Sequence, residues 1–244
     1  MSDITSQVSS SINALTEEFN VITHNLANAS TAGYKRRCNS FARLLEKQSG
    51  PWQDETTRGI AASAAIDFTQ GSLVETGRTL DFALHGKGFF VIETPEGPLY
   101  TRNGTFHTDQ NGQIVDSDGR TVSGEAGPVT VPAGVGQSEL YVSGDGSVSA
   151  KGAQIGKLRV VDFGDNEGKL VSVGSNCFQM PEKGIEPQAA TAAVVKQGYQ
   201  ESSNVETIDE LVDMIMVSRL YEANLKFIAA KKEAQGSILS VAMA

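Results

Sequence analysis

Residues 24–35 read HNLANASTAGYK, and this stretch decides how the chain folds. No glycine or proline precedes Gly33, whereas glycine is frequent from there to Gly198. Asparagine, serine and threonine side chains compete for backbone hydrogen bonds, and glycine readily adopts the positive φ that ends a helix. The stretch therefore predicts that an N-terminal helix ends near Asn28 and that the chain then turns into a different kind of structure.

Upstream of this stretch, apolar residues recur with gaps of 4, 4, 3, 4, 3 and 4 residues. They are Ile4, Val8, Ile12, Leu15, Phe19, Ile22 and Leu26. This spacing is close to the 3.5-residue period of a coiled-coil seam. The intervening serine, threonine and asparagine residues are poor helix formers, so the predicted helix needs a partner to be stable.

The other end of the chain predicts a second, longer helix. Residues 199–244 contain one glycine, Gly236, and no proline. Ser203 with Glu206, and Thr207 with Glu210, have the spacing of a capping box. An apolar stripe follows at Leu211, Met214, Ser218, Tyr221, Leu225 and Ile228. About 40 helical residues would make a rod of roughly 60 Å, which a small domain rarely needs on its surface.

Two narrow seams at opposite ends of one chain favour pairing of the two helices. The alternative is that each helix packs separately on a central domain. Between them, roughly from Thr76 to Pro187, short runs rich in β-formers alternate with glycine-containing turns. This pattern predicts an antiparallel meander of seven or more strands.

The predicted fold class is therefore α+β, with long terminal helices pairing in a coiled-coil-like layer and a central antiparallel β domain. Four segments are expected: residues 1–35 as the N-terminal helix and its turn, 36–75 as an extended connector, 76–198 as the β domain and 199–244 as the C-terminal helix.

The charge balance excludes several classes of function. The chain has 29 acidic and 20 basic residues and a net charge of −9, which disfavours binding to nucleic acid or to anionic lipid.

No apolar run reaches the roughly 18 residues of a membrane span. The N-terminus lacks a basic region followed by an apolar core, so no cleaved secretory signal is expected. Cys38 and Cys177 are the only cysteines, too few for a disulfide framework, and we expect them to be unpaired with each other.

The sequence contains none of the catalytic or ligand-binding motifs that we considered. His24, His85 and His107 stand in no metal-binding context. Gly86-Lys-Gly88 lacks the third glycine of a dinucleotide fingerprint, and Asp162-Phe-Gly164 lacks the other kinase motifs. The sequence therefore predicts no enzyme, no catalytic residue, no cofactor and no metal.

The opening stretch resembles the N-terminal signature of the flagellar basal-body rod and hook family, N-N-L-A-N-x-x-T-x-G-[FY]-K. The matching residues are Asn25, Leu26, Ala27, Asn28, Thr31, Gly33, Tyr34 and Lys35, and His24 replaces the usual first asparagine. Further blocks are similar in the same order: Gln70–Leu73, Thr76–Asp81, Gly86–Phe90, Tyr100–Phe106 and Glu201–Val205. The resemblance thus extends over nearly the whole chain.

The resemblance implies a structural subunit, exported unfolded through the flagellar type III apparatus without a cleaved signal. Such a subunit polymerises with copies of itself and other rod proteins into the drive shaft that crosses the periplasm. It implies no nucleic acid, no small-molecule substrate and no insertion into a membrane. Residues 156–178 are more similar to proximal-rod members than to distal-rod members, and hook proteins usually carry larger insertions.

The predicted assembly interface combines the two seams with the signature turn. Its residues are Ile12, Leu15, Phe19, Ile22, Asn25, Leu26, Asn28, Gly33, Tyr34, Leu211, Met214, Ser218, Tyr221, Leu225 and Ile228. Two other classes of function remain as alternatives. One is a peptidoglycan hydrolase that opens a path for the rod, and the other is a stand-alone binding module built on the β domain.

Overall fold

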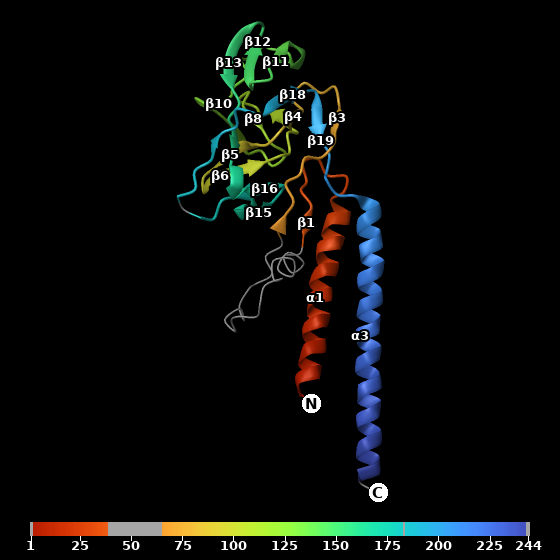
Figure 1. The fold of residues 1–244 in the computed structure, drawn as a ribbon. Coiled ribbons are helices and arrows are strands. Elements are labelled where there is room, and N and C mark those ends of the chain that lie inside the picture. Colours follow the sequence, from red (N-terminus) through yellow and green to blue (C-terminus); the bar gives the residue numbers. More distant parts are fainter. Residues whose placement is uncertain (1, 39–64, 183, 243–244) are drawn as a thin grey trace. The chain divides into compact units, whose positions relative to one another are not determined.

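The computed structural model describes residues 2–38, 65–182 and 184–242 and is drawn as a ribbon in Figure 1. The described chain forms two compact units. The helical unit contains residues 2–27, 37–38, 65 and 205–242, and the β unit contains residues 28–36 and 66–204 without residue 183. Of the connector predicted for residues 36–75, residues 39–64 lie outside the described residues.

Two long helices make up most of the helical unit. Helix α1 spans Ser2–Ala27 and helix α3 spans Thr207–Ala242, and they lie side by side (Figure 1). The predicted end of the first helix near Asn28 is confirmed, because α1 stops where the polar segment begins. The prediction of an α+β chain with a helix at each end is therefore confirmed.

The C-terminal helix begins later than the sequence predicts. Residues 199–206 are not helical: strand β19 (Tyr199–Glu201) pairs with strand β3 (Leu73–Glu75), and α3 starts only at Thr207. The segment predicted as an extended connector has strand β3 at its end. The sequence analysis missed strand β19 because its partner β3 is far away in the sequence. No local turn connects the two strands, so neither one predicts the other.

The β unit consists of short strands. The large sheet is formed by β5 (Phe89–Thr94), β6 (Gly97–Thr101), β7 (His107–Thr108), β8 (Ile114–Val115), β9 (Thr121–Gly124), β10 (Gly127–Pro128), β14 (Val160–Asp162), β15 (Val171–Gly174), β16 (Cys177–Gln179) and β17 (Gln188–Ala189). A second sheet contains β11 (Leu140–Val142), β12 (Ser147–Ala150) and β13 (Ala153–Lys157). Strand β4 (Phe82–His85) pairs with β18 (Val194–Gln197). The remaining short elements are β1 (Arg37–Cys38), β2 (Ala65–Ile66) and the 3₁₀ turns at Gln137–Glu139 and Gly164–Lys169.

The prediction of antiparallel strands is confirmed, but the simple meander is wrong. Neighbouring strands do form local hairpins, such as β5 with β6 and β8 with β9. Strands from late in the chain then return to early ones. Strand β14 pairs with β5, placing Val160 opposite Phe90, and β16 pairs with β6, placing Cys177 opposite Thr101. Hydrophobic alternation shows where strands lie but not which distant strand is the neighbour, so these returns were not predictable.

Strand β5 separates two apolar clusters. Phe90 and Ile92 pack into a core with residues such as Phe82, whereas Phe89 and Val91 pack into a second core on the other face. Successive side chains of a strand point to opposite faces, so one buried strand supplies both cores. This explains the uninterrupted apolar run in strand β5. The two cores on its two faces stabilise the β unit.

Candidate assembly interface

The predicted stripe of α1 is most deeply buried towards the end of the helix. Ile22 is buried and Leu26 is half-buried. Closer to the N-terminus of α1, Ile12 and Leu15 are half-buried. Phe19 keeps 39% of its surface exposed. The pairing of the helices within the chain therefore covers this stripe only in part.

The predicted stripe of α3 is less covered still. Met214, Ser218 and Ile228 are half-buried, and Leu211, Tyr221 and Leu225 are exposed. Ser218 and Tyr221 lie beside the α1 residues Leu15 and Phe19 along a groove of about 340 Å³ between the helices. Its other lining residues are Thr16, Val217 and Glu222.

Among the α3 side chains that the structure describes, residues 207–234, Glu210 and Val217 are buried, with 0% and 8% of their surface exposed, and neither belongs to the predicted stripe. Val217 lies one position before Ser218 of the predicted stripe, so the covered side of α3 is turned slightly from the predicted seam. Glu210 was predicted only as a helix-capping residue. A buried carboxylate is rare without a partner, and its spacing from Val217 by seven residues, two helical turns, was the available signal.

Asn25 of the signature is the polar anchor of the helical unit. Its side-chain Nδ2 donates to the backbone oxygen of Arg37 at 2.8 Å and to Oε1 of Glu210 at 3.2 Å. The backbone N–H of Arg37 donates in return to Oδ1 of Asn25 at 2.9 Å. Asn25 and Glu210 are both completely buried. A buried amide that reaches both α3 and the chain after the turn fixes the register of the two helices.

The signature turn belongs to the β unit. The backbone N–H of Thr31 donates to the backbone oxygen of half-buried Asn28 at 3.0 Å, which closes the turn. Gly33 has φ +68°, and its N–H donates to the backbone oxygen of Glu201 at 2.7 Å. A Cβ atom on Gly33 would lie 2.4 Å from the backbone nitrogen of Asn103. Glycine is therefore required here both by the backbone conformation and by the close approach of the backbone at Arg102 and Asn103.

We expect Gly33→Ala to lower the free energy of unfolding of the β unit by more than the roughly 1–3 kcal/mol of a strained backbone residue. Gly119→Ala is the matched control, because Gly119 has φ +79° but a Cβ atom there would meet no other atom within 4 Å. Urea unfolding of both variants separates the two causes. Equal losses would show that the contact with Asn103 relaxes without cost.

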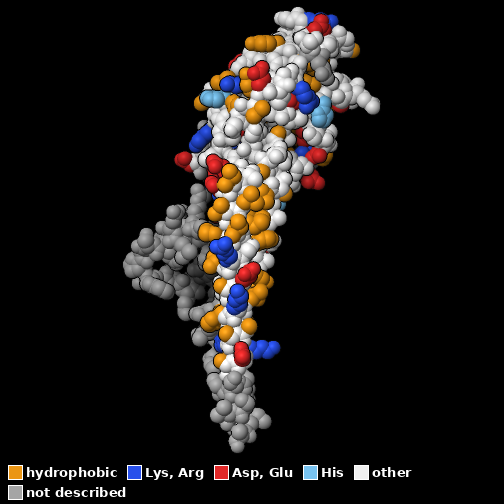
Figure 2. Space-filling view, turned by 90° about the vertical axis from the view of Figure 1, so that its right-hand side faces the viewer, with side chains coloured by type: hydrophobic (Ala, Val, Ile, Leu, Met, Phe, Trp, Pro, Cys, Tyr) orange, Lys and Arg blue, Asp and Glu red, His pale blue; other side chains and the backbone are white. Residues whose placement is uncertain are grey.

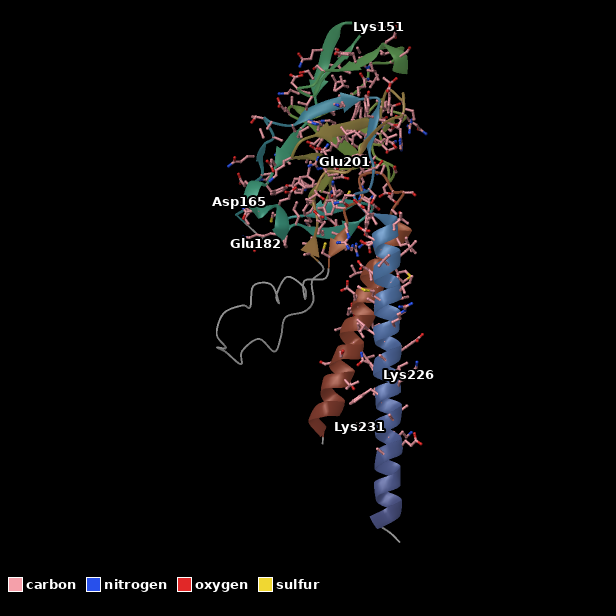
Figure 3. All side chains as sticks on the ribbon, turned by 45° about the vertical axis from the view of Figure 1, so that its right-hand side comes forward. Lys151, Asp165, Glu182, Glu201, Lys226 and Lys231 are labelled. Carbon is pink, nitrogen blue, oxygen red and sulfur yellow. The ribbon has the colours of Figure 1, made fainter. Side chains whose placement is uncertain are left out.

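Next to the turn, three charged side chains meet inside the β unit. Nζ of Lys35 donates to Oε1 of Glu201 at 2.6 Å and to the backbone oxygen of Thr69 at 2.7 Å. NH1 of Arg102 lies 3.5 Å from Oε2 of Glu201. All three side chains are at most 2% exposed, and Glu201 is labelled among the strands in Figure 3. This charged cluster joins the signature, the β core and the segment that leads to α3.

Burial governs the protonation of the charged cluster. Burial lowers the pKa of the Lys35 ammonium and of the Arg102 guanidinium, and in both cases the Glu201 carboxylate opposes the shift. The N–H of Gly71 donates to Oε1 of Glu201 at 3.0 Å. Glu201 is thus the carboxylate that contacts both buried cations, while Asp67 also acts on Lys35, and Glu167 and Asp162 on Arg102. Tyr34, the preceding signature residue, is also buried.

Neither cysteine forms a disulfide in the described structure. Cys177 is buried, and burial raises the pKa of its thiol although Arg120, whose NH2 lies 3.3 Å from its sulfur, opposes this shift. Because the thiolate is the reactive form, we expect Cys177 to be alkylated by iodoacetamide at pH 7.5 far more slowly than half-buried Cys38. Peptide mass spectrometry after timed quenching measures both rates. Equal rates in the folded protein would contradict the burial of Cys177.

Among residues 2–38, 65–182 and 184–242, no group of three or more His, Cys, Asp or Glu side chains is arranged to hold a metal ion. None of the described helices is long and apolar enough to cross a lipid bilayer.

Comparison with known proteins agrees with this arrangement. The family model described as the flagellar hook protein FlgE/F/G D1 domain matches residues 83–150, within the β unit. The model described as the flagellar basal body rod FlgEFG protein C-terminal matches residues 196–241, which include α3. The flagellar basal-body rod protein FlgG of Buchnera aphidicola subsp. Acyrthosiphon pisum is 33% identical over 88% of this chain and 90% of its own length. The chain belongs to the flagellar basal-body rod protein family.

Relatives named FlgG and relatives named FlgF have almost the same sequence identity to this chain. FlgG of Agrobacterium fabrum is 34% identical over 90% of this chain and 91% of its own length. FlgF of Salmonella typhimurium is 32% identical over 88% of both chains. The comparisons therefore do not separate FlgF from FlgG. They do decide between classes of protein, since the rod family is structural and the chain is not an enzyme.

Proposed function

We propose that this chain is a structural subunit of the bacterial flagellar basal-body rod and that it polymerises through its terminal helices. The observation that supports this most strongly is similarity from end to end to proteins named as rod subunits, over about nine-tenths of both chains. The exposed apolar residues of the helical unit are consistent with it, because a helix that is apolar on several sides is normally buried by neighbours.

The finer assignment is to the proximal rod. The basis is the similarity of residues 156–178 noted in the sequence, and a distal-rod or hook-type axial protein is the alternative. The proposed partners are copies of the chain, other rod proteins and the flagellar export apparatus. The proposed location is the rod where it crosses the periplasm, reached without a cleaved signal peptide.

Within this function, each segment has its own proposed role. The helices α1 and α3 would form a coiled-coil-like layer of the rod. The fifteen residues of the predicted interface would contribute in two ways. The apolar seam residues would contact neighbouring subunits, whereas Asn25, Asn28, Gly33 and Tyr34 would hold the geometry of the chain that presents them.

Deleting the gene and imaging the purified basal bodies tests the proposal. We expect non-motile cells whose basal bodies lack part of the rod, and restoration of both by the wild-type gene. Complete rods without this chain would contradict the proposal. Incubation of the purified protein with cell-wall sacculi should release no peptidoglycan fragments.

A further inference from the structure

The last part of the β unit pairs with its first part. Strand β18 pairs with β4, placing Val195 opposite Leu84, and strand β19 pairs with β3, placing Glu201 opposite Leu73. Figure 1 shows these four strands together in the β unit. The pairing is nested, because β3 takes the last strand of the unit and β4 takes the strand before it. We call residues 194–204, which contain β18 and β19, the strap.

Strand β4 depends on the strap for its backbone hydrogen bonds. Phe82, Ala83 and Leu84 are completely buried, and among the described strands β4 pairs with β18 alone. Buried N–H and C=O groups without a partner cost free energy, so β4 cannot be stable inside the core when β18 is missing. Val195 of the strap is itself buried in the core that contains Phe82 and Leu84.

One side chain of the strap joins two other parts of the β unit. The N–H of Val142 donates to Oε1 of Gln197 at 3.0 Å. Nε2 of Gln197 donates to the backbone oxygens of Thr79 at 2.9 Å and Leu140 at 3.1 Å. Gln197 therefore satisfies backbone groups of strand β11 and of the segment that precedes β4. The strap thus connects segments that make no hairpin with each other.

The strap also supplies a carboxylate to the charged cluster. Glu201 contacts the buried side chains of Lys35 and Arg102, and its backbone oxygen accepts from the N–H of Gly33 in the signature turn. Without the strap, both buried cations would lose the carboxylate that contacts them. Buried charges without a partner are strongly unfavourable. The signature turn and the β core therefore need Glu201 in order to take their observed positions.

We propose that the strap closes the β unit and that this unit has no stable tertiary structure until residues 194–204 are available. Synthesis starts at the N-terminus, so most of the chain exists before its strap does. The β unit therefore stays unfolded for most of that time, whereas the hairpins of a simple meander could form one after another. The inference goes beyond the proposed function, since it concerns when the chain folds. Its consequence for the proposed export is that late closure prolongs the unfolded state.

Cleavage of the folded full-length protein tests the strap. A protease recognition sequence is inserted between Thr191 and Ala192, which are exposed in the turn before β18, because exposed turns tolerate insertions. After cleavage, residues 1–191 are separated in urea and returned to buffer. We expect this fragment to show no cooperative thermal transition by near-ultraviolet circular dichroism. Adding a synthetic peptide of residues 192–206 should restore the transition.

The matched control has the same recognition sequence between Glu206 and Thr207, after the strap and before α3. Both cuts remove α3 with its exposed apolar side chains (Figure 2). The two products therefore differ only in residues 192–206. We expect the product that ends at Glu206 to keep the thermal transition of the β unit.

Two variant peptides measure the part played by the charged cluster. A peptide with Glu201→Gln should restore residues 1–191 at least about a hundredfold more weakly than the wild-type peptide, because one partner of a buried ion pair is lost. A peptide with Glu206→Gln makes the same chemical change at an exposed residue outside the strap. This second peptide should act like the wild type.

Several results would overturn the inference. These are a cooperative transition in residues 1–191 alone, no restoration by the wild-type peptide, or equal restoration by the Glu201→Gln peptide. Loss of the transition in the product that ends at Glu206 would also overturn it, since the strap would then not suffice to close the unit. The proposed function has a separate measurement, which is the presence of the wild-type chain in purified basal bodies.

Discussion

Replacing Glu201 with Gln is expected to lower the free energy of unfolding of the β unit by about 3–5 kcal/mol, the usual cost of removing one partner from a buried ion pair. The Glu201 carboxylate lies between the Lys35 ammonium, 2.6 Å away, and the Arg102 guanidinium, 3.5 Å away. The variant would leave two buried cations facing each other. Urea unfolding followed by near-ultraviolet circular dichroism measures the loss.

Glu182→Gln is the matched control for that variant. Glu182 also accepts from a lysine, Lys169, at 3.0 Å, but both side chains are about half exposed. An exposed pair contributes roughly 0–1 kcal/mol, so this variant should unfold almost as the wild type does. Similar losses in the two variants would mean that water reaches Glu201 and that the charged cluster is not a structural anchor.

A double-mutant cycle sharpens the argument. Lys35→Met removes one of the two cations, and the double variant with Glu201→Gln leaves only Arg102 to be compensated. Residues in direct contact within one network show coupling energies of about 0.5–3 kcal/mol. We therefore expect the double variant to be less destabilised than the sum of the two single variants. Strict additivity would indicate that Lys35 and Glu201 act independently.

Local signals in the sequence predicted the helices and the end of α1 correctly. The polar residues before Gly33 compete for backbone hydrogen bonds within a few positions of the chain. Their effect on the end of α1 therefore depends on local sequence. The start of α3 was misplaced because Tyr199–Glu201 pairs with Leu73–Glu75. That pairing depends on a strand more than a hundred residues away, and a capping pattern at Ser203 carries no information about it.

Of the buried contact between Asn25 and Glu210 within one chain, the sequence analysis selected Asn25 through the signature but not Glu210. A search for an apolar stripe selects Met214 and Ile228 and rejects Glu210, although Glu210 is the residue that α3 buries against Asn25. The preference for an apolar pattern is sound in general, because buried carboxylates are rare. It fails here because the partner amide comes from a motif at the other end of the chain.

The charged cluster had a signal that a pattern search could have used. Lys35, Arg102 and Glu201 each lie in a block that resembles the rod family, and each is the kind of residue that is seldom buried alone. Three such residues of opposite charge in three separate blocks suggest that their side chains contact one another in the fold. The distances that make it a cluster require the fold, since only the return of β19 to β3 brings Glu201 to the signature.

Leu225→Asp is expected to abolish assembly while leaving the folded chain intact. Leu225 is 45% exposed on α3, so the single molecule loses little when it changes. If a neighbouring subunit covers this side chain in the rod, the contact is worth roughly 1.5–3 kcal/mol. A buried carboxylate without a partner adds a larger penalty. Every subunit of a polymer repeats the defect, so secreted, soluble protein and non-motile cells should result.

Val173→Asp controls for the introduction of a charge at an exposed apolar site. Val173 is 48% exposed on strand β15 of the β unit, outside the helices proposed to assemble. Its variant should enter rods and restore motility, and both variants should keep the thermal transition of the β unit. Under the proposed export of the unfolded chain, both proteins should also be secreted equally. Normal rods built from Leu225→Asp protein would show that this side of α3 faces solvent in the polymer, and assembly would then have to depend on the remaining sides of the helix.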